Sequence, residues 1–152
     1  MEIKSVFNAS SYEAIKNRIE NLQPNAERQW GKMDIAQMLA HCCIPLEQGT
    51  GKVPFHDDSN FIFRTLIKWV VLQQVKKGSF RRNGPTAKSF YVTDERQFAV
   101  EKQRLLATLA EFYEKGQNGH LMPHPAFGSF TKDNWGQLMH LHLHHHLTQF
   151  SN

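Results

Sequence analysis

The chain has little cysteine and no uninterrupted apolar run of membrane-spanning length. Its two cysteines, Cys42 and Cys43, are neighbours, and adjacent cysteines cannot join in a normal disulfide. This agrees with a reducing compartment. The longest apolar stretch, residues 61–75, is interrupted by charged and amide side chains, and the first residues lack the apolar run of a signal peptide. These absences predict a soluble, cytoplasmic protein without a membrane partner.

Low-complexity segments are also missing. The chain has 152 residues, of which 40% are hydrophobic, and this is long enough to bury a proper core. We therefore expect one domain over residues 1–152.

Strand patterns are scarce, and helical periodicity covers most of the chain. Helices are expected over about 11–23, 34–47, 60–76, from after 93 to about 115, and within 131–150. Ser10 or Ser11 would cap the first helix, Asp34 with Gln37 resembles a capping box at the second, and Gly116 would stop the fourth. Four long amphipathic helices with one shorter inserted helix predict an all-α bundle, in whose core facing helices can build a metal site.

Positive charge is concentrated in one segment of a chain whose net charge is +4. Between residues 76 and 88 lie five cations in a stretch with two glycines and a proline that indicates a loop, namely Lys76, Lys77, Arg81, Arg82 and Lys88. Such a loop is either solvated surface or a site of attraction for an anionic substrate or nucleic acid. No recognition-helix, zinc-finger or RNA-binding pattern supports nucleic acid.

Five histidines lie in the last helical segment, at positions 140, 142, 144, 145 and 146. At about 100° per residue, His142 and His146 fall within about 20° of Trp135, at the centre of the apolar face. His140 and His144 point the opposite way, and His145 lies on the flank. Two imidazoles one turn apart on a buried face can bind one metal ion from the same side.

Two simpler interpretations of these histidines stay open. One is a purification tag, although tags are not interleaved with apolar residues at helical spacing. The other is a pair of core histidines, whose four ring nitrogens would all need partners. Gln149 lies near the same face and would bond either a ligand imidazole or another polar group of the interior.

A catalytic tetrahedral site needs a third protein ligand. Outside the last helix the candidates are His41, His56, His120 and His124. The last three resemble turn or surface residues, since they lie among acidic residues or prolines. His41 lies within an apolar helix, on the flank of its main stripe, so periodicity gives it moderate support. Cys42 and Cys43 point away from His41 on that helix and are better explained as small buried residues.

Three motifs together resemble the DinB/YfiT-like superfamily. They are Trp30–His41 (WGKMDIAQMLAH), His124–Gly128 (HPAFG), and Trp135-Gly136 followed by His142–Phe150 (HLHHHLTQF read as H-x-x-H-H-L-x-Q-F). Within that superfamily the chain is most similar to a branch of unknown function. The resemblance implies a four-helix bundle in which one histidine of the second helix and a His-x-x-x-His pair of the last helix bind a divalent metal. By position these ligands are His41, His142 and His146, and imidazole suits Zn, Ni and Fe alike.

The resemblance also implies a class of chemistry. Characterised members include thiol-dependent enzymes, in which the metal activates a low-molecular-weight thiol. A metal-dependent enzyme acting on a small-molecule substrate, of the thiol S-transferase or hydrolase kind, is the first hypothesis. A non-catalytic metal-binding or stress-associated protein is the alternative. The sequence leaves the oligomeric state open, a homodimer included.

Overall fold

The computed structural model describes residues 3–54, 61–124, 127–128 and 130–151. In these residues the regular structure is helical, with no strand beyond an isolated bridge between His124 and Gly128. The elements are α1 (Ala9–Asn21), α2 (Ile35–Thr50), α3 (Phe61–Lys77), the 3₁₀ helix η1 (Lys88–Phe90), α4 (Phe98–Gln117) and α5 (Lys132–Gln149). The prediction of an all-α fold is confirmed.

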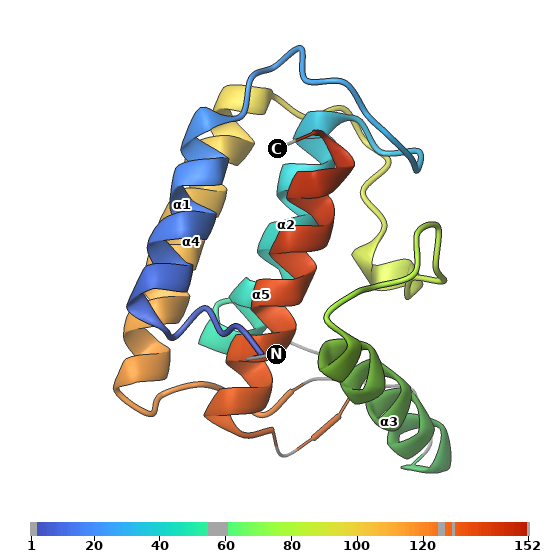
Figure 1. The fold of residues 1–152 in the computed structure, drawn as a ribbon, viewed down its shortest axis with the longest axis vertical. Helices are drawn as coiled ribbons and strands as arrows, with labels where there is room; N and C mark the ends of the chain where they lie inside the picture. The colour runs from blue at the N-terminus through green and yellow to red at the C-terminus, as the bar shows by residue number, and fades with distance from the viewer. Residues whose placement is uncertain (1–2, 55–60, 125–126, 129, 152) are drawn as a thin grey trace.

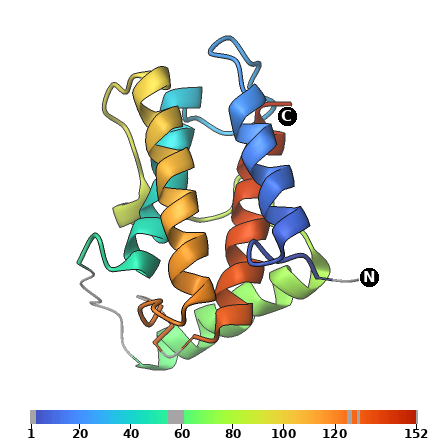
Figure 2. The same ribbon diagram turned by 90° about the vertical axis from the view of Figure 1, so that its left-hand side faces the viewer.

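Four of the helices form a bundle, and the fifth lies beside it. In Figures 1 and 2 the axes of α1, α2, α4 and α5 run side by side, whereas α3 crosses obliquely near one end. Helix α2 packs on α4 and α5, and α1 packs on the same two helices. The order around the bundle is therefore α1, α4, α2, α5. This arrangement makes α2 and α5 neighbours, although almost a hundred residues separate them in the chain.

Polar caps set the starts of three bundle helices. The side chain of Asn8 accepts hydrogen bonds from the backbone N–H groups of Ser10 and Ser11, so α1 begins before the serines that the sequence favoured as caps. The predicted capping box between Asp34 and Gln37 is present at α2. Thr131 caps α5 through the backbone N–H of Asn134.

The fourth helix differs from its expected bounds. Helix α4 begins at Phe98, whereas a start after Thr93 was expected. It also continues past Gly116, which is a buried helical residue and not a stop. A Cβ at this position would collide with the Phe7 ring. The glycine is therefore explained by close packing against the N-terminal segment, and the helix ends at Gln117 with Asn118 as its cap.

Helix α2 is buried on nearly every side. Fourteen of its sixteen residues are buried, because α4 covers one flank, α5 covers another and the segment after α3 covers part of the remainder. His41 on the predicted flank is consequently only 4% exposed. A helix without an exposed face has no single apolar face that repeats along the sequence. This is why the periodicity of α2 placed His41 on a flank and not among its buried residues.

An ion-pair network joins α2 to α4 beside this core. Arg104 donates two hydrogen bonds to the carboxylate of Glu47, at 2.8 and 2.7 Å, and one to Glu101 at 3.0 Å. Arg96 donates to the other oxygen of Glu101. Both glutamates are buried, so their charges depend on these arginines for compensation.

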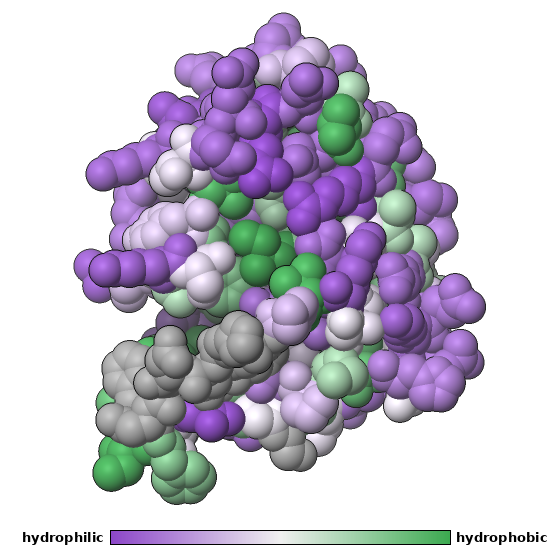
Figure 3. Space-filling model, turned by 180° about the vertical axis from the view of Figure 1, so that it is seen from behind, coloured by the Kyte–Doolittle hydropathy of each residue, from purple (hydrophilic) through white to green (hydrophobic). Residues whose placement is uncertain are grey.

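Helix α3 exposes much of its apolar surface. Phe61 and Ile62 are each about 80% exposed, and Leu66 and Trp69 are more than half exposed. Figure 3 shows this projecting helix at the lower left, with apolar atoms on its surface. None of the described helices is long and apolar enough to cross a membrane.

Candidate metal centre

The interface between α2 and α5 brings three histidines together. His41 comes from the middle of α2, and His142 and His146 come from successive turns of α5. One ring nitrogen from each lies within 4.8 Å of the others, and the Nε2 atoms of His41 and His142 are 3.0 Å apart. The His142 and His146 ring centroids are 4.8 Å apart. The structure thus assembles the three residues that the sequence proposed as a ligand set.

A backbone carbonyl fixes the orientation of His41. Its Nδ1 lies 2.8 Å from the carbonyl oxygen of Phe90 in η1. A carbonyl can only accept, so Nδ1 carries the proton and Nε2 presents a lone pair. That lone pair faces His142.

A side-chain amide orients His146 in the same way. Nδ1 of His146 is 2.9 Å from Oε1 of Gln149, and Nε2 of Gln149 donates to the Trp30 carbonyl at 2.8 Å. The bond to Trp30 fixes the amide orientation, because only its nitrogen can donate. Oε1 therefore accepts from His146, whose Nε2 is left with its lone pair. Both roles that the sequence left open for Gln149 are observed, because its amide bonds a candidate ligand and also another polar group, the Trp30 carbonyl.

His142 has no such partner among the described residues. Its Nδ1 is buried without a hydrogen bond, and its Nε2 meets Nε2 of His41. Because His41 presents a lone pair there, the contact is favourable only if a proton or a cation lies between the two nitrogens. In either case the buried Nδ1 of His142 lacks a partner among the described residues, as a lone pair beside a protonated Nε2 or as an N–H beside a metal-bound Nε2.

Burial keeps the three imidazoles neutral. Desolvation lowers the pKa of His41, against the opposing effect of the Phe90 carbonyl. Desolvation lowers the pKa of His142 well below its ordinary value, and the nearby His146, His41 and His145 add to this effect. The pKa of His146 falls to about 3, chiefly through desolvation. Neutral imidazole is the form that coordinates a metal.

The separation of two of the three nitrogens is close to that in a tetrahedral site of a divalent ion, and the third nitrogen lies within 4.8 Å of them. Metal–nitrogen bonds of about 2.0–2.1 Å in a tetrahedral site place two nitrogens about 3.3 Å apart, close to the observed 3.0 Å between His41 and His142. The hydrogen bonds from two of the rings to a carbonyl and an amide are the outer contacts that ligand histidines usually make. This three-histidine group could hold a metal ion.

The other histidines of α5 lie outside this group. His144 is exposed, His140 is half-buried, and their rings stack on each other. Arg18 of α1 donates to Nδ1 of His144 at 2.8 Å. His145 is half-buried, with its ring centroid 5.1 Å from that of His146 and 5.4 Å from that of Trp30. The predicted division of the helix into two histidine faces is observed.

The remaining candidates for a third ligand are not in the group. His120 is exposed, as expected, and His56 lies outside the described residues. Of the two positions expected for His124, a turn or the surface, the turn is observed and the surface is not. His124 is in a turn but only 7% exposed, and it stacks on Phe127 with ring centroids 4.0 Å apart. Desolvation and the nearby Lys68 lower its pKa to about 3.

The two cysteines are buried, free thiols. Desolvation raises the pKa of Cys43 to about 12, and it also raises the pKa of Cys42. Neither thiol is therefore a thiolate at neutral pH, and neither belongs to the three-histidine group. Their interpretation as small buried residues agrees with the structure.

Sequence reasoning missed the two carbonyls that complete the centre. Phe90 and Trp30 contribute backbone oxygens, and a backbone oxygen leaves no mark in side-chain periodicity. One signal did exist, namely the glycine after Trp30. Gly31 has a φ of +85°, and a Cβ at this position would collide with the Gln149 amide. The glycine of the Trp-Gly pair in the first motif is thus required because the backbone passes close to the Gln149 amide.

Comparison with known proteins identifies a family. A family model described as "Protein of unknown function (DUF1569)" matches residues 3–152. The chain therefore belongs to the DUF1569 family. No curated protein and no solved structure matches it.

Proposed function

We propose that this member of the DUF1569 family binds one divalent metal ion through His41, His142 and His146 and is a metal-dependent enzyme acting on a small molecule. One observation carries the proposal. In His41 and His146, Nδ1 donates its proton to an acceptor, so Nε2 keeps a lone pair. These two nitrogens lie in one cluster with a ring nitrogen of His142. Core histidines without a ligand gain only the one hydrogen bond between His142 and His41 from this convergence, because three neutral rings can share few protons.

The donor set indicates the chemistry that the ion would supply. Three neutral ligands leave a divalent ion with its full charge, so it stays a strong Lewis acid that can stabilise a thiolate or hydroxide near neutral pH. The buried cysteines supply no such thiol. A thiol S-transferase would therefore take its thiol from a low-molecular-weight cofactor, and a hydrolase would take water.

We also propose that the fold is related to the DinB/YfiT-like superfamily. The support comes from the arrangement of the helices and from the positions of the candidate ligands. The chain forms a four-helix bundle with one added helix, its candidate ligands come from α2 and the last helix, and the last two are spaced as His-x-x-x-His. These are the positions that the sequence resemblance implied.

The experiment begins with metal analysis of untagged protein and continues with zinc titration of the chelator-treated protein. One ion per chain is expected in the wild type, and His41→Ala should lose most of it. The matched control is His120→Ala, which removes an exposed histidine. If His41→Ala keeps full metal content, His41 is not a ligand and the proposed site is wrong.

Catalysis is tested separately with the metal-loaded protein. A panel of low-molecular-weight thiols is combined with electrophilic substrates, and ester and amide hydrolysis is assayed in parallel. Turnover that is lost after chelation and restored by the ion supports the enzyme. Stoichiometric metal binding without turnover across the panel would favour a non-catalytic metal-binding protein.

A further inference from the structure

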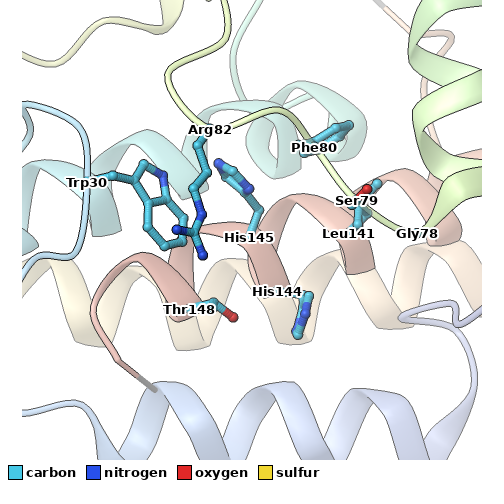
Figure 4. A pocket seen from close by; sticks show the side chains of 9 residues that line it. All are labelled: Trp30, Gly78, Ser79, Phe80, Arg82, Leu141, His144, His145 and Thr148. Carbon is cyan, nitrogen blue, oxygen red and sulfur yellow. The ribbon is translucent and has the colours of Figure 1, made fainter.

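We propose that a second, separate pocket beside α5 binds a small organic carboxylate with a flat apolar body. The pocket lies between α5 and the basic segment that follows α3, and it has a volume of about 140 Å³. His145 separates it from the candidate metal ligands. Figure 4 shows Trp30, Arg82 and His145 side by side in this pocket, with Thr148 and His144 nearby. The proposal does not depend on a metal.

Arg82 is the residue that would bind the carboxylate. Its guanidinium carbon lies over the Trp30 ring, 4.2 Å from the ring centroid. A guanidinium presents its N–H donors as a planar fork, and this fork matches a carboxylate in a bidentate manner. No hydrogen bond or ion pair joins Arg82 to another residue in the described part of the chain.

The surroundings favour a negative charge. None of the described residues that line the pocket is acidic. Arg18 approaches from α1 and donates to His144 and Thr148, both of which line the pocket. The Arg18 guanidinium thus lies just behind the wall of the pocket. Two arginines without a lining carboxylate create a positive local potential that would attract a small anion.

The walls favour a flat, apolar body. The Trp30 indole and the Phe80 ring both face His145, with centroid separations of 5.4 and 5.9 Å. The volume limits the ligand further, because an apolar cavity of about 150 Å³ is filled by benzene. A pocket of about 140 Å³ therefore has room for one small ring. Benzoate is the simplest molecule with both required features.

The pocket shares one residue with the candidate metal centre. The Trp30 side chain forms a wall of the pocket, while its carbonyl accepts from Gln149, which orients His146. A ligand that stabilises the Trp30 position would thereby also stabilise the orientation of His146. Any effect of benzoate on metal affinity must be matched by an equal effect of the metal on benzoate affinity.

Calorimetric titration of verified metal-free protein with benzoate tests the pocket without involving the metal. Arg82→Gln and Arg81→Gln are matched variants, since they remove the same charge from neighbouring exposed positions and only Arg82 lines the pocket. Wild type and Arg81→Gln should bind benzoate alike, whereas Arg82→Gln should weaken binding about tenfold or more. Arg82→Lys should not restore it, because an ammonium lacks the planar fork.

Three results would overturn the proposal. They are equal benzoate affinity in the two glutamine variants, equal wild-type affinity for benzoate and neutral benzamide, and no benzoate binding at millimolar concentrations. Inorganic phosphate that binds as tightly as benzoate would overturn the assignment of a ring-bearing ligand. Because every arm uses metal-free protein, these outcomes are independent of whether the three histidines bind an ion.

Discussion

Nδ1 of His146 lies 2.9 Å from Oε1 of Gln149, within the last turn of α5. The same amide donates to the carbonyl of Trp30, which lies in the α1–α2 loop. The candidate ligand is therefore held by a chain of two hydrogen bonds that ends on the backbone of a distant segment. Tautomer and ring orientation of His146 both depend on this chain.

Gln149→Ala should lower metal affinity without removing a ligand. Loss of the acceptor frees the His146 ring to adopt either tautomer, and removal of such outer partners typically costs about 10–100-fold in affinity. Gln137→Ala, on the same helix and outside the site, is the matched control. Zinc titration with a competing chelator measures the difference, and equal affinities in the two variants would contradict the role of Gln149.

Gly31→Ala should lower both stability and metal affinity, whereas Gly119→Ala should lower stability alone. Both glycines have positive φ, +85° and +74°, so an alanine costs about 1–2 kcal/mol at either position. Only at Gly31 would the new Cβ collide with the Gln149 amide, since a Cβ at Gly119 meets open space. Denaturant unfolding gives the stability and zinc titration gives the affinity. Unchanged zinc affinity in Gly31→Ala would show that Gln149 adapts freely.

Arg104→Met should destabilise the bundle by about 3 kcal/mol, because it leaves two buried carboxylates without their shared partner. Glu47 and Glu101 have side chains only 5% and 6% exposed. Lys16→Met is the control, since its pairs with Glu13 and Glu20 are exposed and should be worth less than about 1 kcal/mol. Comparable losses in urea unfolding would mean that the buried network contributes no more than a surface pair.

His124 should contribute to acid destabilisation. Its pKa is about 3 in the folded protein and about 6.5 when unfolded, so between these values the unfolded chain binds a proton that the folded chain does not. The free energy of unfolding therefore falls as pH decreases through this interval, by about 1.4 kcal/mol per pH unit for one such histidine.

The variant His124→Phe keeps a ring for stacking on Phe127 and removes this titration. Its stability should decrease less steeply than that of the wild type below pH 6.5. His120→Phe, at an exposed position, is the matched control for the exchange of a histidine for a phenylalanine. Chemical unfolding of metal-free protein at a series of pH values provides the test, and a wild-type slope in His124→Phe would contradict a neutral, buried His124.

Sequence reasoning worked best where one helix face decided the answer. The 3.6-residue period separated His142 and His146 from His140 and His144, and the box between Asp34 and Gln37 marked the start of α2. It worked less well where burial came from several sides. His41 looked peripheral because periodicity assumes one buried face, and α2 has almost none exposed.

Contacts between segments that are distant in sequence could not be predicted from the sequence. The sequence predicts a helix stop at Gly116, because the contact of this glycine with Phe7 comes from a segment about a hundred residues away. The Phe90 carbonyl belongs to a segment without periodicity, and the pairing of Arg104 with Glu47 requires knowledge that α2 and α4 are neighbours. Side-chain type and spacing could predict candidate ligands but not the backbone groups that orient them.

The central claim is that one face of α5 binds a metal and the other does not. Zinc titration of metal-free protein, with stoichiometry and affinity measured for four single variants, tests it most directly. We predict that His142→Ala and His146→Ala each lose most of the bound zinc, whereas His140→Ala and His144→Ala keep one ion per chain at nearly wild-type affinity. Equal loss from both pairs, or no zinc bound by the wild type, would contradict the proposed three-histidine metal site.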